Sequence, residues 1–252
     1  MNKNTNPKTK IPKLLVKPVG RAISDFGMIR EGDKILLAVS GGKDSLSLFH
    51  ILRHFKRCAP INFDLGVVTV DPQVEGFEPK ALETFFNKFD TPYYFEEFPI
   101  MEQAKISMKG DSYCSFCSRI KRGLMYQAAR REGYNVLALG QHLDDLSESL
   151  IMSICHNGKV QTMKAHYIND DKDLRVIRPL VYVRERQLAD FASNMDLPVI
   201  ADSCPACFSM PTERQYFKEM LLNEEKRTPN LYKNLLSAMR PILDETKGTL
   251  DG

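Results

Sequence analysis

The chain has 252 residues, of which 43% are hydrophobic and 27% are charged, and its formal net charge at pH 7 is +3. This length can bury the core of one large domain, or of one domain with an appendage, and the composition is typical of a soluble globular protein. No apolar stretch approaches the ~20 residues of a membrane-spanning helix, and the basic N-terminus lacks the apolar core of a signal peptide. We therefore expect a cytoplasmic protein with no membrane partner and with only local basic character.

The first 30 residues are predicted to be a basic arm followed by a helix. Every charged residue before Asp25 is a lysine or an arginine, and helical periodicity runs from about Leu14 to Met28. A basic arm of this kind can contact the phosphates of a nucleic acid. The candidate contacts, for which tRNA is the expected partner, are Lys10, Lys13, Lys17 and Arg21. A solvated tail is the competing interpretation.

An apolar run, a glycine pair and the start of a helix follow one another at residues 35–45, Ile-Leu-Leu-Ala-Val-Ser-Gly-Gly-Lys-Asp-Ser. The run from Ile35 to Val39 is typical of a buried parallel strand, and a helix is predicted from Asp44 to about Cys58. In between, a tight glycine turn can point its backbone N–H groups at an anion, and a helix N-terminus attracts phosphate. The motif is neither a Walker A loop nor a G-x-G-x-x-G turn. It resembles the PP-loop of ATP pyrophosphatases, with a plain strand–turn–helix corner as the alternative.

Predicted strands and helices alternate along most of the remaining chain. The strands are expected at residues 65–70, 93–95, 136–139 and 176–183, with a short extended piece at 197–200. The helices are expected at residues 81–89, 117–131, 146–155, 184–195, 212–225 and 230–239. This alternation indicates right-handed βαβ units and a parallel sheet. We expect an ATP-binding α/β domain over residues 31–200 and a C-terminal cysteine motif with helices over 201–252.

Three polar segments directly follow predicted strands. Ser40 follows the first strand, Asp71 follows the second, and Gly140 opens the segment Gly-Gln-His-Leu-Asp-Asp145 after the strand at 136–139. Ligands of open parallel sheets bind at the carboxyl ends of the strands. These segments are therefore expected to converge on one crevice.

Four of the six cysteines form two C-x-x-C pairs, Cys114–Cys117 and Cys204–Cys207. In a cytosolic chain such pairs favour metal or redox chemistry over disulfides, because two thiolates in a tight turn can chelate one centre. A reversible dithiol is the alternative, and the pattern alone does not separate zinc from an iron–sulfur cluster. The remaining two, Cys58 and Cys155, are expected to be small buried hydrophobic residues.

Taken together, these motifs resemble the tRNA 2-thiocytidine synthetase family of PP-loop ATP pyrophosphatases over about residues 20–239. The landmarks are Ser40-Gly-Gly-Lys-Asp-Ser45, Ala59-Pro-Ile-Asn-Phe63, the segment from Cys114 to Gly123, Ala138-Leu-Gly-Gln-His-Leu-Asp-Asp145, Ile177-Arg-Pro-Leu180 and Leu236-Ser-Ala-Met239. The resemblance implies an α/β fold of the HUP type (adenine nucleotide alpha hydrolase-like), with ATP, Mg²⁺ and a [4Fe-4S] cluster held by three cysteines. It also implies thiolation of cytidine 32 in tRNA, with sulfur supplied by a cysteine desulfurase or another donor. The oligomeric state is open, with a homodimer as one option.

The resemblance assigns roles to individual residues. Asp44 and Asp145 would hold Mg²⁺ or orient the loop, Lys43 would neutralise phosphate charge, and these three are the candidate catalytic residues. The implied ATP-binding set is Ala38, Ser40, Gly41, Gly42, Lys43, Asp44, Ser45, Asp71, Gly140, His142 and Asp145. The implied cluster ligands are Cys114, Cys117 and Cys207, with Cys204 as the alternative third ligand. Further tRNA contacts are expected from Arg119, Lys121 and Arg122, which could instead form a solvated helix face.

Two other function classes remain open from the sequence. The first is a different PP-loop RNA-modifying enzyme, such as a lysidine synthetase or a wobble thiouridylase, although lysidine synthetases do not need the cysteine pairs. The second is a non-catalytic nucleotide-binding sensor of metal or redox state. Turnover distinguishes the sensor from the enzymes, because a sensor would bind ATP without releasing pyrophosphate.

Overall fold

The computed structural model describes residues 10–74, 76–77, 79–107, 113–200 and 212–244. Six strands form one sheet in the order β3-β2-β1-β4-β6-β5, in which all neighbours are parallel except β5 and β6. The strands are β1 (Asp33–Ala38), β2 (Phe63–Asp71), β3 (Tyr93–Glu97), β4 (Val136–Ala138), β5 (His166–Ile168) and β6 (Arg175–Ile177). The predicted α/β sheet of the HUP type is confirmed.

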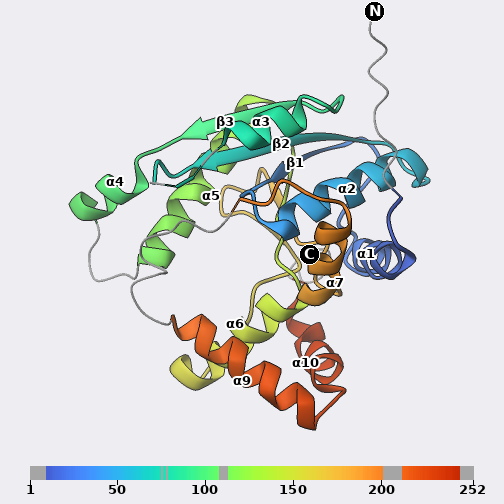
Figure 1. The fold of residues 1–252 in the computed structure, drawn as a ribbon, viewed down its shortest axis with the longest axis vertical. Helices are drawn as coiled ribbons and strands as arrows, with labels where there is room; N and C mark the ends of the chain where they lie inside the picture. The colour runs from blue at the N-terminus through green and yellow to red at the C-terminus, as the bar shows by residue number, and fades with distance from the viewer. Residues whose placement is uncertain (1–9, 75, 78, 108–112, 201–211, 245–252) are drawn as a thin grey trace, which may run out of the picture.

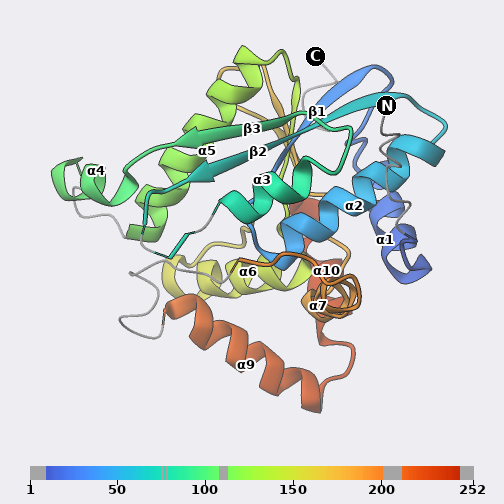
Figure 2. The same ribbon diagram turned by 45° about the horizontal axis from the view of Figure 1, so that its top comes forward.

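Helices cover both faces of this sheet (Figures 1 and 2). They are α1 (Lys13–Asp25), α2 (Lys43–Cys58), α3 (Lys80–Phe86), α4 (Ile100–Ser107), α5 (Tyr113–Arg131), α6 (Leu143–Asn157), α7 (Glu185–Asn194), α9 (Glu213–Arg227) and α10 (Leu231–Met239), with a short 3-10 helix η1 (Arg240–Ile242). Helices α9 and α10 pack against α6 at the end of the molecule away from β3 (Figure 1). No helix in the described part of the chain is long and apolar enough to cross a membrane.

Alternation along the strands divides the interior into two layers. Ile35 and Leu37 of β1 face the larger layer, which also takes in apolar residues of α1, α2, α6 and α7. Leu36 lies between them in sequence and faces the smaller layer, formed with Ala128 and Ala129 of α5. Successive side chains of a strand point to opposite faces, so an apolar run without alternation belongs to a strand that is buried on both sides.

Several predicted elements differ from those of the structure. The strand expected at 176–183 ends at Ile177, because Pro179 has no N–H for a ladder hydrogen bond. The extended piece at 197–200 joins no sheet. Helix α4 and the antiparallel edge strand β5 were not predicted. Both are short, and β5 pairs with β6 on one side and has a single bridge from His166 to Asp244 on the other, so neither leaves a clear periodic pattern.

Candidate active site

The turn between β1 and α2 has a backbone that requires glycine. Gly41 has a φ of +86°, in the left-handed region. A Cβ at this position would lie 3.0 Å from Cβ of Ile200, and the Ile200 N–H donates to the Gly41 carbonyl at 3.0 Å. Both the torsion and the neighbouring side chain therefore exclude a larger residue. Ile200, in the segment after α7, therefore packs against the loop.

Two serines hold the loop against the first turn of α2. The Ser45 hydroxyl donates to the carbonyl of Gly42 at 3.0 Å and accepts the N–H of Ser40 at 3.3 Å. The N-terminus of α2 begins after Gly42 without a side-chain cap. Its first N–H groups and its dipole are therefore available to an anion such as pyrophosphate.

A second loop, after β4, packs against the same turn. A Cβ on Gly140 would lie 3.2 Å from the backbone N and Cα of Ser45. The loop then starts α6 with a reciprocal cap. The N–H of His142 donates to Asp145 Oδ2 at 3.0 Å, and His142 Nδ1 accepts the N–H of Asp145 at 3.4 Å. His142 Nε2 lies 3.7 Å from Asp44 Oδ2. The starts of α2 and α6 therefore meet.

Asp44 occupies an environment that disfavours its charge. Burial raises the pKa of Asp44, although the charges of His142 and Lys43 act in the opposite direction. Its Oδ1 is buried and has no hydrogen-bond partner among the described residues. Mg²⁺ is commonly held by one or two carboxylates together with substrate phosphates. Asp44 and the nearby Asp145 have the chemistry for such a site.

Lys43 bridges two carboxylates, because its Nζ lies 3.2 Å from Oδ2 of its neighbour Asp44 and also contacts Glu185 of α7. Its Nζ lies 2.9 Å from Oε1 of Glu185, and Lys218 of α9 lies 2.6 Å from the other oxygen of the same carboxylate. Burial alone would raise the pKa of Glu185, but the hydrogen bonds from Lys218 and Lys43 lower it to about 2. Lys43 must leave Glu185 before it can neutralise a phosphate.

A cavity of about 440 Å³ lies at the carboxyl ends of the strands, a size typical of small-molecule sites. It brings together many of the predicted residues, namely Ala38, Ser40, Gly42, Asp44, Ser45, Gly140, Asp145, Lys121 and Arg122. Among the described residues, the lining does not include Gly41, Lys43, Asp71 or His142. Asp71 instead accepts the N–H of Gln73 at 2.7 Å.

The cavity has both an apolar and a cationic part. Val68 and Val70 of β2, Leu139 and Met125 give apolar surface against which a base can pack. Four cations line the rest, Lys121, Arg122, Arg178 and Arg214. The loop, an acidic pair and these cations surround one space, which suits a nucleotide with its metal ion.

Arg178 was not predicted as a site residue. Its side chain is buried, Nε donates to Gln141 Oε1 at 2.9 Å, and a second nitrogen donates to the Lys164 carbonyl at 2.6 Å. Burial lowers the pKa of Arg178, and no carboxylate within the described ranges pairs with it. A buried cation without a counter-charge is costly, so a cavity-lining guanidinium favours an anionic ligand. The strand expected at 176–183 included Arg178. Pro179, which cannot continue a strand ladder, was the available signal that the strand ends before Arg178.

The C-terminal helix α9 also reaches the cavity. A guanidinium nitrogen of Arg214 lies 3.6 Å from Asp145, and Nε lies 3.8 Å from Glu148. Glu148 is only 3% exposed. Burial and then the charge of Asp145 raise its pKa to about 7. Neither residue was identified from the sequence, because nothing local shows that α9 folds back onto α6.

The predicted nucleic-acid contacts fall into two groups. Lys121 and Arg122 line the cavity, and Arg119 is exposed earlier on the same helix, α5. The other four are exposed on or just before α1 and line no part of that cavity. One predicted role, tRNA contact, was therefore assigned to cations that lie on different surfaces of the folded protein.

The first cysteine pair belongs to α5 rather than to a tight turn, since both Cys114 and Cys117 fall inside this helix. Cys117 is half-buried against the cluster of Ile100, Ala104 and Phe116. Ser118 and Lys121 of the same helix line the cavity, so the cysteine-bearing end of α5 adjoins the nucleotide site.

The second pair, Cys204 and Cys207, lies outside the described residues. Within the described ranges, no group of three metal-ligating side chains is found. The expectation for the two single cysteines was wrong, because Cys58 and Cys155 are exposed. Each stands at or near the C-terminal end of its helix.

Comparison with known proteins identifies the family of this chain. The family model described as a PP-loop domain matches residues 8–225. The tRNA-cytidine(32) 2-sulfurtransferase of Geobacter sulfurreducens is 39% identical, with 90% of this chain and 89% of the relative covered. The enzyme of the same name from Pectobacterium atrosepticum is 37% identical, with 96% and 79% covered.

Solved structures show the same fold. The U34-tRNA thiolase NcsA of Methanococcus maripaludis, solved with its [4Fe-4S] cluster, is similar with a TM-score of 0.74 at 22% identity, over 91% of this chain and 78% of that one. NMN synthetase from Francisella tularensis has a TM-score of 0.54 at 13% identity, over 90% and 95%. From its sequence relatives, the chain belongs to the tRNA-cytidine(32) 2-sulfurtransferase family of PP-loop proteins.

Proposed function

We propose that this protein uses ATP to replace the C2 oxygen of cytidine 32 in tRNA with sulfur. The family membership names the reaction of the relatives. The observation that carries the proposal to this chain is the cavity itself. It joins the PP-loop and the Asp44–Asp145 pair to the basic, cysteine-bearing helix α5, so that nucleotide and RNA base can meet in one place.

The first chemical step activates the base. The cytidine C2 oxygen attacks the α-phosphate of ATP, a bond forms between this oxygen and phosphorus, and the bond to the β-phosphate breaks with release of pyrophosphate. Negative charge grows on the departing pyrophosphate. The N–H groups at the start of α2 and the buried Arg178 would stabilise that charge, while Asp44 and Asp145 would hold Mg²⁺ on the phosphates.

The second step transfers sulfur. Sulfide sulfur bonds to C2, the C2–O bond breaks, and AMP leaves with the former carbonyl oxygen. No net oxidation or reduction occurs. A [4Fe-4S] cluster held by Cys114, Cys117 and Cys207 would have one iron without a protein ligand, which supplies a place to bind sulfide. The sulfur itself would come from a cysteine desulfurase or another donor. A desulfurase delivers persulfide sulfur, which takes two electrons from a thiol reductant to become the sulfide used in this step.

Nucleoside mass spectrometry of bulk tRNA tests this proposal. We expect cells without the gene to lack 2-thiocytidine, and the intact gene to restore it. A gene encoding Asp145→Asn should fail to restore it at equal protein abundance. Unchanged 2-thiocytidine in the deletion strain would contradict the proposal, and loss of a 2-thiouridine instead would identify a different base as the substrate.

A further inference from the structure

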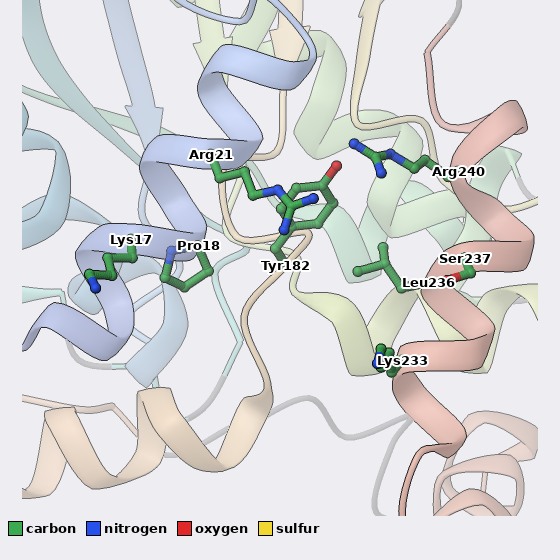
Figure 3. A pocket seen from close by; sticks show the side chains of 8 residues that line it. All are labelled: Lys17, Pro18, Arg21, Tyr182, Lys233, Leu236, Ser237 and Arg240. Atoms are coloured by element: carbon green, nitrogen blue, oxygen red, sulfur yellow. The ribbon is translucent and has the colours of Figure 1, made fainter.

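A second hollow, away from the nucleotide cavity, lies between helix α1 and the last described helices of the chain. It has a volume of about 430 Å³ and is formed by α1 on one side and by α10 and η1 on the other, with Tyr182 between them (Figure 3). We call it the α1–α10 groove. Its cations are Lys17, Arg21, Lys233 and Arg240. None of these residues lines the nucleotide cavity.

Beside the groove, the carboxylate of Asp25 contacts both of its arginines. Asp25 Oδ2 accepts the Tyr182 hydroxyl at 2.9 Å and Arg240 at 2.7 Å, and lies 3.5 Å from Arg21 Nε. The Arg21 guanidinium lies 5.8 Å from the centre of the Tyr182 ring. Two guanidinium groups are therefore held in place by a single negative charge, which leaves the cluster positive.

The two lysines are not neutralised in this way. No ion pair to Lys17 or Lys233 is found in the described part of the chain, and Lys17 is exposed. Four cations and one carboxylate leave an excess of positive charge over the groove. Such a surface attracts a polyanion.

The spacing of the cations favours a chain of phosphates over a single anion. Lys17 and Arg21 are four residues apart on α1, and Lys233 and Arg240 are seven apart along α10 into η1. At a rise of 1.5 Å per residue these pairs span roughly 6 Å and 10 Å along the helix axes. Lys13 extends the row on α1 by one more turn. A free phosphate meets cations around one point, whereas two rows of this length match consecutive phosphodiesters.

We propose that the α1–α10 groove binds the phosphodiester backbone of the RNA substrate, as a second contact site separate from the catalytic cavity. The inference rests on the proposed function for the identity of the RNA. The groove lies next to the catalytic loops, because Tyr182 is followed by Val183, whose carbonyl accepts the N–H of Leu143 at the start of α6. An RNA can reach both places at once, which a nucleotide cannot.

The test is tRNA binding by Lys17→Gln/Lys233→Gln, measured at several salt concentrations. The lysines are chosen because their loss leaves no buried partner unpaired. The control is Lys88→Gln/Lys172→Gln, which makes the same change of net charge at exposed lysines on other parts of the surface. We expect the groove variant to bind tRNA about tenfold more weakly than the wild type in ~0.1 M salt. The magnitude of the slope of log K against log salt should fall by about 1 to 2.

The control variant should bind tRNA as the wild type does, and both variants should keep the thermal stabilisation by ATP. Equal affinities and slopes for the groove variant and the wild type would overturn the groove while leaving the proposed function intact. A wild type that binds no tRNA would overturn both. Equal weakening by the control variant would also overturn the groove, because net charge alone would then explain the effect.

Discussion

At the scale of single residues, the site contains charged groups whose pairing within the protein is incomplete. Asp44 keeps one oxygen without a partner, and Arg178 is a buried cation without a carboxylate among the described residues. Buried charges left in this state cost stability. Functional sites commonly carry such costs, since the missing partners are supplied by the ligand.

Asp44→Asn should separate stability from activity. We expect pyrophosphate release to fall at least 100-fold, because the amide cannot hold a cation. The free energy of unfolding should stay within about 1 kcal/mol of the wild type, because removal of a half-buried charge offsets the loss of its ion pair with Lys43. Urea unfolding and a pyrophosphate assay measure the two quantities. Asp64→Asn, at a largely exposed aspartate, is the control and should change neither. A large loss of stability in Asp44→Asn would show that Asp44 is a structural residue.

Glu148 should make the stability of the ATP-free protein pH-dependent near neutrality. Its pKa of about 7 in the folded protein exceeds the usual 4.5, so the folded state binds the proton more tightly. The stability is therefore full at low pH and is lost as the pH rises through 7. We expect a decrease on the order of 2 kcal/mol between pH 5 and 8. Glu185, with a pKa of about 2, stays charged throughout this range.

Glu148→Gln is the matched variant for this pH effect. Its free energy of unfolding should be nearly constant from pH 5 to pH 8, and above that of the wild type at pH 8. Denaturant titrations at four or five pH values give the comparison. If the wild type and the variant change in parallel with pH, another group is responsible.

At the scale of elements, the site depends on three helices that meet at their starts. The first turns of α2 and α6 are joined through Gly140 and His142, and the start of α7 is bound to α6 through Asp144. Arg184, just before α7, connects this group to the C-terminal helices. It contacts Asp144, forms two hydrogen bonds with Glu225 of α9, and lies over the ring of Tyr232 of α10.

Arg184→Ala should therefore destabilise the protein by about 3 kcal/mol, because the buried Asp144 and the half-buried Glu225 both lose their contact with the guanidinium group. Arg184→Lys should restore only part of this, since an ammonium group cannot form the planar two-pronged contact. Urea unfolding measures both effects. Arg186→Ala is the control, because Arg186 is exposed and makes a longer contact of 3.6 Å with the same Glu225. This variant should change the free energy of unfolding by less than about 0.5 kcal/mol. Equal losses in both alanine variants would refute the role of Arg184.

At the scale of the whole molecule, the two main hydrophobic layers on the faces of the sheet do not include Cys117 among their described residues. The two main layers are filled by the strands and by helices packed on each face. Cys117 packs against the small cluster around Phe116. The fold should therefore form whether or not a cluster is bound, unlike small domains that need a metal ion in order to fold.

Cys117→Ala should lose the visible absorbance of an iron–sulfur cluster and lose thiolation. Its far-UV circular dichroism and its stabilisation by ATP should be retained, and its free energy of unfolding should remain within about 1 kcal/mol of the wild type. Cys207→Ala should behave in the same way and Cys204→Ala should keep activity. The opposite result for these two would identify Cys204 as the third ligand. Global unfolding of Cys117→Ala would show that the cluster supports the fold.

The sequence by itself determined the sheet class, the strand–loop–helix motif at residues 35–45 and the family. These features depend on local periodicity and on residues that are close together in the chain. Gly41 is an example, because its place in a turn after an apolar run already indicates a left-handed backbone.

Only the tertiary structure decided which side chains are buried and which charges meet. The contact between Lys43 and Glu185, the approach of Arg214 to Glu148, and the groove between α1 and α10 all join residues that are far apart in the chain. Burial and electrostatic pairing depend on distance in space. The order of residues along the chain does not show these distances, because they are set only when the chain folds.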